Sequence, residues 1–376
     1  IEFQGGRSTR LNSLAGASPD RLVRTLTDDN MFWRSHAQRL LVERGNGDVV
    51  GALIDLIDDQ NVDALELNPG AIHALWTLEG LGLLADPEVG VYDSVVGALS
   101  HPSAGVRRNA VMVLPRGGAS SAAILRAHLL DDQDAQVRIA ALLALADSPA
   151  DSSIAYRTAQ FLMQPGNADD RYLREAATMV AARNAMNFLR NALTGVSGTP
   201  SAGLLEVVER VATHWASGTE SGQLGSLLRL AGQADVSVLL ALLDGLLAGG
   251  RETVRPELTA GDRRYLKQLM EGLEFAAQDA MVALAQSWGE TDLFAGNLES
   301  VLRELRIRVG DSSMAPNEQV RAAARLIRLA DNEDSLAHVI DQIQWQTPSD
   351  LAVGLIRELG GSDSEAVVSI LSAAWK

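Results

Sequence analysis

A short motif recurs along the chain: a bulky apolar residue is followed by Arg and, three positions after the Arg, by Ala. Two copies extend much further, because a shift of 31 residues superimposes LSHPSAGVRRNAVMVL (residues 99–114) on LDDQDAQVRIAALLAL (residues 130–145), and residues 26–41 fit the same frame without a gap. Such a recurrence indicates a copied supersecondary unit, which buries its apolar face only by stacking on its neighbours. The sequence therefore predicts a repeat array. The five motif arginines are Arg34, Arg107, Arg138, Arg174 and Arg321.

The repeated unit is expected to be a pair of helices. Apolar residues follow helical periodicity, as at Val49, Leu53 and Ile57, while β alternation is almost absent. The motif copies at Arg34 and Arg107 are 73 residues apart, which is two units of about 36 residues. We expect about ten helical hairpins. The expected organisation is an N-terminal extension or linker at residues 1–17, one repeat array at residues 18–376, and an irregular connection near residues 249–260.

Composition excludes several classes of function. The sequence has no Cys, so disulfides, thiolate metal sites and thioether-linked haem are excluded within it. The net charge of −16 opposes binding to nucleic acid, because an acidic surface repels phosphate backbones. No apolar run is long enough to cross a bilayer, so membrane insertion is not expected.

The negative charge is concentrated in residues 51–100, which contain no Lys or Arg. One interpretation is a solvated face on a Lys-poor protein. The other is a docking surface for a basic partner or for divalent cations. The nine carboxylates are those of Asp55, Asp58, Asp59, Asp63, Glu66, Glu79, Asp86, Glu88 and Asp93.

The pattern Asp/Pro-x-x-x-Val-Arg-x-x-Ala with flanking Leu resembles the HEAT repeat over most of the chain, most strongly at residues 22–146 and 316–329. The resemblance implies an all-α fold: an α-solenoid whose antiparallel helix pairs stack into a curved right-handed superhelix. It also implies a scaffold that mediates protein–protein or interdomain contacts.

A narrower resemblance lies near the start. Residues 30–45 (NMFWRSHAQRLLVERG) and 67–81 (LNPGAIHALWTLEGL) are similar to the HEAT segment of large bacterial proteins of the membrane-bound dehydrogenase or c-type haem-binding class. These place a β-propeller before the array and a cytochrome domain after it. The resemblance implies export, for example to the periplasm, and a flanking propeller or cytochrome domain, or a separate subunit, as partner. With no Cys-x-x-Cys-His, it carries over neither haem nor redox chemistry, and no cofactor is expected.

The motif arginines and the tryptophans of these blocks each have two interpretations. A row of guanidinium groups could bind carboxylates or phosphates, or it could form a structural ladder against the turns of its own and adjacent repeats. Trp33 and Trp76 could pack as wedges between repeats or present an exposed aromatic pair. The partner-binding candidates are Trp33, Arg34, Arg39, His73, Trp76 and Glu79.

No catalytic constellation or metal signature is visible, because no two His residues are three or four positions apart. The leading hypothesis is a non-catalytic scaffold or spacer within an exported redox protein. The alternatives are a free-standing adaptor, which would bind a basic protein or a glycan through its acidic surface, and a HEAT-like lyase.

Overall fold

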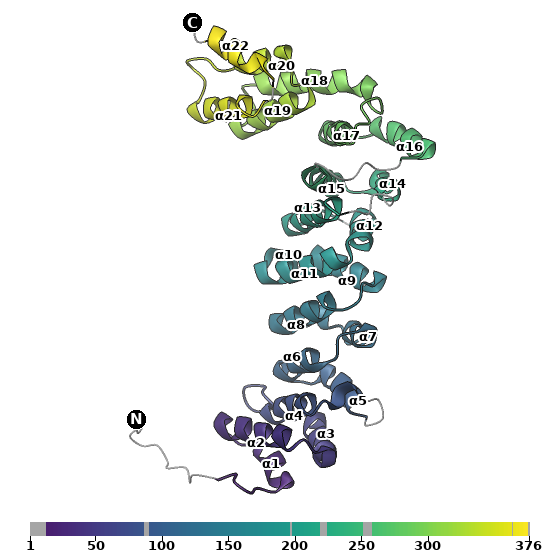
Figure 1. Ribbon diagram of the computed structural model, residues 1–376, viewed down its shortest axis with the longest axis vertical. Coiled ribbons are helices and arrows are strands. Elements are labelled where there is room, and N and C mark those ends of the chain that lie inside the picture. The colour runs from purple at the N-terminus through teal and green to yellow at the C-terminus, as the bar shows by residue number, and fades with distance from the viewer. Residues whose placement is uncertain are drawn as a thin grey trace. The chain divides into compact units, whose positions relative to one another are not determined.

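The computed structural model describes residues 13–85, 90–195, 198–218, 224–250, 258–362 and 364–374. All regular structure in these residues is helical, and they contain no β-strand, which confirms the predicted fold class. The helices form two compact units, Ile1–Asn184 (unit 1) and Ala185–Lys376 (unit 2). Each unit is an α-solenoid of stacked hairpins (Figure 1). Most of the expected N-terminal extension, residues 1–12, lies outside the described residues, as do residues 251–257 of the expected irregular connection.

In unit 1 every hairpin joins a first helix to a second helix, and each second helix packs on the second helix of the next hairpin. These second helices are called the second-helix layer below. The first helices are α1 (Pro19–Thr25), α3 (Val50–Asp58), α5 (Val91–Gly97), α7 (Gly118–Arg126) and α9 (Ser152–Met163), with the short α10 (Pro165–Asp169) after α9. The second helices are α2 (Met31–Arg44), α4 (Pro69–Gly80), α6 (Ala104–Val113), α8 (Ala135–Ala146) and α11 (Arg171–Arg183).

Unit 2 repeats this arrangement. The first helices are α12 (Ala185–Gly195), α14 (Leu224–Leu228), α16 (Ala260–Met270), α18 (Ala295–Gly310) and α20 (Glu333–Ile340). The second helices are α13 (Ala202–Ala216), α15 (Val236–Gly249), α17 (Phe275–Ser287), α19 (Pro316–Leu329) and α21 (Ser349–Leu359), and α22 (Ala366–Ala374) follows. The expected connection near residues 249–260 therefore separates α15 from α16.

The Ala of the motif lies on the buried side of the second helices of unit 1. In unit 1 the side chains of Ala37, Ala110, Ala141 and Ala177 are fully buried, each on a second helix. The small methyl group permits the backbones to approach, and the larger apolar residues around it fill the remaining core. The repeated Ala is thus a packing residue.

In unit 2, α13 and α15 approach more closely than Ala would permit. A Cβ atom added at Gly245 would lie 2.3 Å from the backbone oxygen of Glu209, and one at Gly249 would lie 2.2 Å from that of Thr213. Gly is therefore required at two successive turns of α15 by the neighbouring backbone.

Candidate functional site

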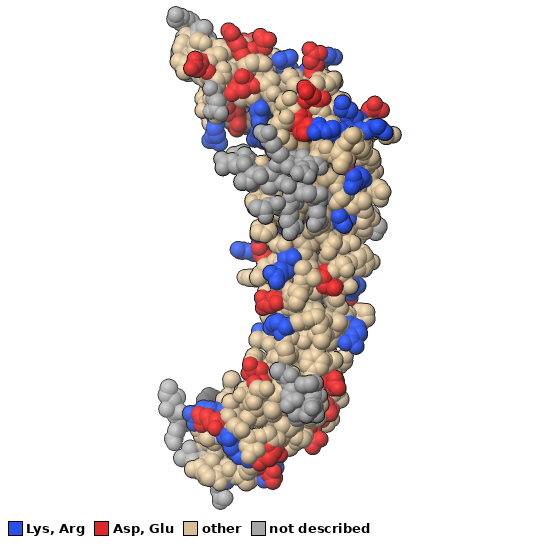
Figure 2. Space-filling model, turned by 45° about the vertical axis from the view of Figure 1, so that its right-hand side comes forward, with Lys and Arg blue, Asp and Glu red and all other residues tan. Residues whose placement is uncertain are grey.

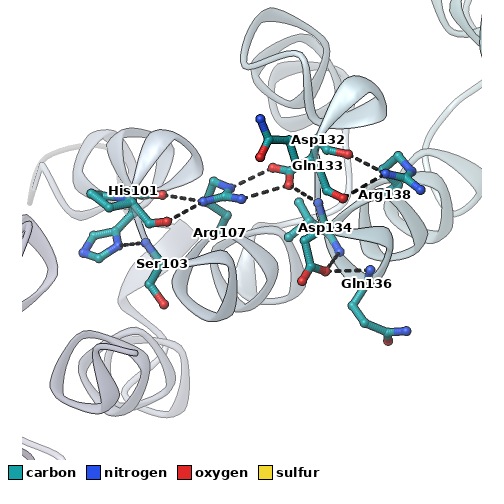
Figure 3. A network of polar contacts seen from close by, with 10 residues as sticks. His101, Ser103, Arg107, Asp132, Gln133, Asp134, Gln136 and Arg138 are labelled. Carbon is teal, nitrogen blue, oxygen red and sulfur yellow. Dashed lines mark hydrogen bonds and ion pairs between the residues drawn. The ribbon is translucent and has the colours of Figure 1, made fainter. Parts of the chain in front are cut away.

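Four of the motif arginines close the turn that joins the two helices of a hairpin. Each is the fourth residue of its second helix, and its Nη1 donates to the backbone oxygens six and five residues earlier. For Arg107, the oxygens of His101 and Pro102 both lie 2.8 Å from Nη1 (Figure 3). For Arg138, those of Asp132 and Gln133 lie at 2.6 and 3.2 Å. Arg34 and Arg174 make the same contacts. The four guanidinium groups are therefore used in structural hydrogen bonds to the turns of their own hairpins, as the structural-ladder interpretation predicts.

Arg107 also joins its hairpin to the next one. Its Nε and Nη2 donate to the two carboxylate oxygens of Asp132 at 2.7 and 2.8 Å, and both side chains are largely buried. Burial alone would raise the pKa of Asp132, but hydrogen bonds from Arg107 and from the backbone N–H of Asp134 hold that pKa below its ordinary value. The backbone oxygen of Asp132 binds Arg138 at the same time (Figure 3). Asp132 therefore contacts two successive motif arginines, Arg107 through its carboxylate and Arg138 through its backbone oxygen.

Arg321 does not occupy the position of the other motif arginines. It is the sixth residue of α19 and is exposed. The fourth residue is Gln319, whose buried side chain donates through Nε2 to the backbone oxygen of Val309 at 3.0 Å. Gln278 occupies the fourth position of α17 and donates to the oxygens of Met270 and Leu273. In these two hairpins the carboxamide of Gln at the fourth position donates to backbone oxygens that precede the second helix, as the arginine guanidinium does in unit 1.

Two of the partner-binding candidates connect successive second helices. The indole Nε1 of Trp76 donates to Oδ1 of Asn109 on α6 at 2.7 Å. The Nδ1 of His73 lies 2.6 Å from Oε1 of Gln38 on α2. Burial, together with the positive charge of Arg34, lowers the pKa of His73. Both side chains are half-buried, so much of their surface contacts neighbouring helices and is not available to a partner.

The other candidates lie nearer the surface. Trp33 is half-buried and packs edge-on against the Phe32 ring at a centroid distance of 5.0 Å. Arg39 is exposed, with its Nε 3.7 Å from Oε1 of Glu43, and Glu79 is exposed at the end of α4. The described residues show no ring contact between Trp33 and Trp76. The sequence interpretation missed Phe32, which is 64% exposed beside Trp33.

The acidic stretch of residues 51–100 is used partly for local structure. Asp63 Oδ1 accepts from the backbone N–H of Leu65 and Leu67, and the backbone oxygen of Asp59 accepts from the Asn68 amide. Asp86 and Glu88 lie outside the described residues. Within the described residues, no group of three or more His, Cys, Asp or Glu could hold a metal ion. On the face shown in Figure 2, acidic and basic side chains are interspersed.

Three exposed apolar side chains occupy equivalent places on successive second helices. Met112 on α6, Leu143 on α8 and Met179 on α11 each follow their motif arginine by five residues. Their exposed fractions are 41%, 41% and 54%. We call these three residues the apolar row. The sequence contains this regularity, but it becomes visible only when exposed and buried positions of the helices are distinguished.

Unit 2 contains a cavity of about 210 Å³ lined by residues of α15, α17 and α19. Arg325 of α19 pairs there with Asp279 of α17 and, through Nη2 at 3.3 Å, with Oδ1 of Asp244 on α15. Burial raises the pKa of both carboxyl groups, although Arg325 opposes the shift. We call this cavity the carboxylate pocket. None of these residues was singled out from the sequence.

A family model described as HEAT repeats matches residues 62–146, which include α4, α5, α6, α7 and α8. A solved structure described as an engineered protein, from the Northeast Structural Genomics Consortium, is similar with a TM-score of 0.36 and 16% identity, over 92% of this chain and 99% of that chain. No curated protein matches this chain. The chain is thus an α-solenoid, and residues 62–146 of it are similar to HEAT repeats. None of its described helices is both long and apolar enough to span a membrane.

Proposed function

We propose that this chain is a non-catalytic scaffold that binds a protein partner along the second-helix layer of unit 1. HEAT repeats generally serve as protein-interaction scaffolds, and a stacked layer of helices offers an extended surface for that purpose. The four motif arginines of unit 1 do not provide the binding groups, since their guanidinium groups bind turn carbonyls. Contact must come from other side chains of the layer.

The observation that carries the proposal is the apolar row. Single exposed apolar residues are common on protein surfaces and need no explanation. Met112, Leu143 and Met179 are different, because they occupy one register position on three successive helices. Packed helices lie about 8–10 Å apart, so the row offers evenly spaced apolar contacts. Methionine side chains adapt their shape to a partner surface. Tyr172, two helical turns before Met179, extends the row on α11.

We infer the identity of the partner from the resemblance of residues 30–45 and 67–81 to propeller–HEAT–cytochrome proteins. On this basis the chain acts in an exported, periplasmic redox protein, and its partner is the flanking propeller or cytochrome domain. The exposed Phe32 beside Trp33 would give α2 a place in that contact. The full reading frame of the gene tests this inference: propeller repeats before the array and a Cys-x-x-Cys-His segment after it are expected. A frame with neither would refute the inference.

The scaffold proposal is tested by placing a photo-crosslinking amino acid at positions 112, 143 or 179 in the source cells. The same partner should be captured at all three positions, and not at Tyr156, an exposed aromatic residue on the first helix α9. The triple variant M112D/L143D/M179D should then bind that partner at least tenfold more weakly, because each Asp would have to be desolvated in the contact. Equal binding by the triple variant would refute the proposal. Binding that weakens steeply with salt would favour the acidic adaptor instead.

A further inference from the structure

The loop that joins α3 to α4 interrupts the regular pattern of unit 1. It comprises ten residues, 59–68, between Asp58 at the end of α3 and Pro69 at the start of α4. The corresponding connections in the first, third and fourth hairpins are shorter: residues 26–30, 101–103 and 132–134. The helix α4 also lacks the motif arginine, because its fourth residue is Ile72. An insertion in one repeat forms a loop on one face of the array, often the binding face. We call residues 59–68 the inserted loop.

Hydrogen bonds stabilise the conformation of the inserted loop. The Asn68 amide closes the loop by donating through Nδ2 to the backbone oxygen of Asp59 at 2.8 Å. Within the loop, Oδ1 of Asp63 accepts from the backbone N–H groups of Leu65 and Leu67 at 2.8 and 2.9 Å. The side chains of the loop are therefore presented in a defined arrangement before a partner binds, which lowers the entropy cost of binding.

Three apolar side chains of the inserted loop are exposed. The exposed fraction is 76% for Leu65, 42% for Leu67 and 40% for Val62. Leu65 therefore exposes a larger fraction of its surface than any residue of the apolar row. Scattered exposed apolar residues need no explanation, but an apolar patch with a polar border marks an interaction site. The inserted loop has this composition, because its apolar residues alternate with carboxylates.

The charge around these apolar side chains is negative and is not balanced by nearby cations. The sequence has no Lys or Arg between Arg44 and Arg107. Arg44 is paired with Asp48 and Arg107 with Asp132, while Arg34 binds the turn before its own helix. Four exposed carboxylates form no ion pair within the described residues: those of Asp58, Asp59, Asp63 and Glu66. This surplus of negative charge favours a partner surface that carries Lys or Arg.

We propose that the inserted loop is a docking site for a protein that has an apolar pocket bordered by Lys or Arg side chains. Leu65 enters that pocket, and the carboxylates of the loop face its basic border. A lipid surface fits less well, because anionic head groups would repel the four carboxylates. This inference rests on the proposed function only in taking the partner to be a protein. The apolar row lies on α6, α8 and α11, so the two surfaces can be tested separately.

Photo-crosslinking in the source cells identifies the partner. The photoreactive amino acid is placed at Ala64, an exposed position beside Leu65, and at Gln133 as the matched control. Gln133 is exposed in the turn before α8, which has no insertion. A protein captured at position 64 and not at position 133 should be cross-linked at an apolar pocket bordered by Lys or Arg. No capture at position 64, or a cross-link to an acidic or wholly polar surface, would overturn the proposal.

Binding kinetics with the purified captured protein separate the apolar contact from the charges. L65A should raise the dissociation rate constant at least about tenfold, because it removes the side chain that fills the pocket. D58N/E66Q should lower the association rate constant about threefold or more, since exposed charges at the border of a contact act mainly on association. A64S, in the same loop, should change neither constant. Unchanged dissociation in L65A, or unchanged association in D58N/E66Q, would refute the proposed contact.

Two further measurements distinguish this site from the other possible surfaces. Loss of binding in L65A but not in M112D/L143D/M179D would support the inserted loop alone, and the reverse result would refute the loop and support the apolar row. Flotation of the full chain with phosphatidylcholine vesicles tests a lipid surface directly. Flotation that L65D abolishes would assign the loop to a membrane and overturn the proposal.

Discussion

Arg107 and Asp132 form a two-point ion pair between successive hairpins, with Nε–Oδ2 and Nη2–Oδ1 distances of 2.7 and 2.8 Å. The same arginine binds the backbone oxygens of the turn before its own helix. A residue that bonds both its own turn and the next repeat stabilises the fold in two ways. The contribution of the Arg107–Asp132 pair to the free energy of unfolding can therefore be measured by mutation of either residue.

Replacing Arg107 by Ala should lower the free energy of unfolding by about 3–5 kcal/mol, because it leaves the largely buried Asp132 carboxylate without its cation. Urea denaturation of the full chain measures this change. R108A is the matched control, since Arg108 is exposed on the same helix and its loss should change stability by less than about 0.5 kcal/mol. If R107A and R108A had the same effect, the ladder would have no structural role.

The stability of the chain should also depend on the pH through Asp132. Its pKa is lower in the folded chain than in the unfolded chain, so it stabilises the fold above its ordinary pKa. That contribution is lost as the pH falls through the folded value. D132N should therefore flatten the acid limb of the unfolding curve below about pH 4. An acid limb of unchanged slope in D132N would contradict the assignment.

Gln319, not Arg321, should carry the stabilising contact of α19. Q319A removes the donor for the buried oxygen of Val309 and should lower the free energy of unfolding by about 1–3 kcal/mol. R321A, two residues away at an exposed position, should have an effect within about 0.5 kcal/mol. Thermal and urea unfolding of both variants measure the difference. A larger effect of R321A would mean that Arg321 has the same structural role as the other motif arginines.

His73 should make the first hairpins sensitive to mild acid. Burial lowers its pKa in the folded chain, so the unfolded chain binds the proton more readily and stability is lost as the pH falls below about 6.5. H73Q should remove part of this dependence between pH 7 and pH 5, whereas H128Q, at an exposed residue between α7 and α8, is the control. Equal pH dependence of H73Q and the unmodified chain would count against the predicted shift.

The contact of α13 with α15 should tolerate no Cβ atom. G245A places a methyl group against the backbone of Glu209, so we expect loss of more than about 3 kcal/mol or failure to fold. G296A, near the start of α18, meets open space and should leave stability unchanged or slightly higher. Circular dichroism and urea unfolding of the two variants distinguish these outcomes. A stable G245A would mean that the two helices are farther apart.

The fold could be predicted from the sequence because the repeats are copies. Val106 and Val137, the residues that precede Arg107 and Arg138, are fully buried at the same place in two hairpins, so one alignment describes both. Arg321 shows the limit of this reasoning. The motif specifies spacing between residues, but the role of the arginine depends on its distance from the start of the helix. Pro316 starts α19 five residues before Arg321, which moves the fourth position to Gln319.

The carboxylate pocket could not be predicted, because its residues are far apart in the sequence. Asp244 and Asp279 are separated by 35 residues, and Arg325 lies 46 residues after Asp279. Only the stacking of three hairpins brings them together. One sequence feature pointed to the site: each aspartate is a single charge within an apolar helix, in LLALLDGLLAG and AAQDAMVALA. A charge in such a place is buried unless the helix is exposed, and buried charges require partners.

The polar side-chain contacts at three successive junctions between hairpins of unit 1 differ from one another. Gln38 meets His73, Trp76 meets Asn109, and Arg107 meets Asp132. The three junctions therefore use different side-chain pairs, so the hairpins are not identical modules. Deleting the hairpin that carries His73 and Trp76 would remove the present partners of both Gln38 and Asn109, so each hairpin is fitted to the two beside it.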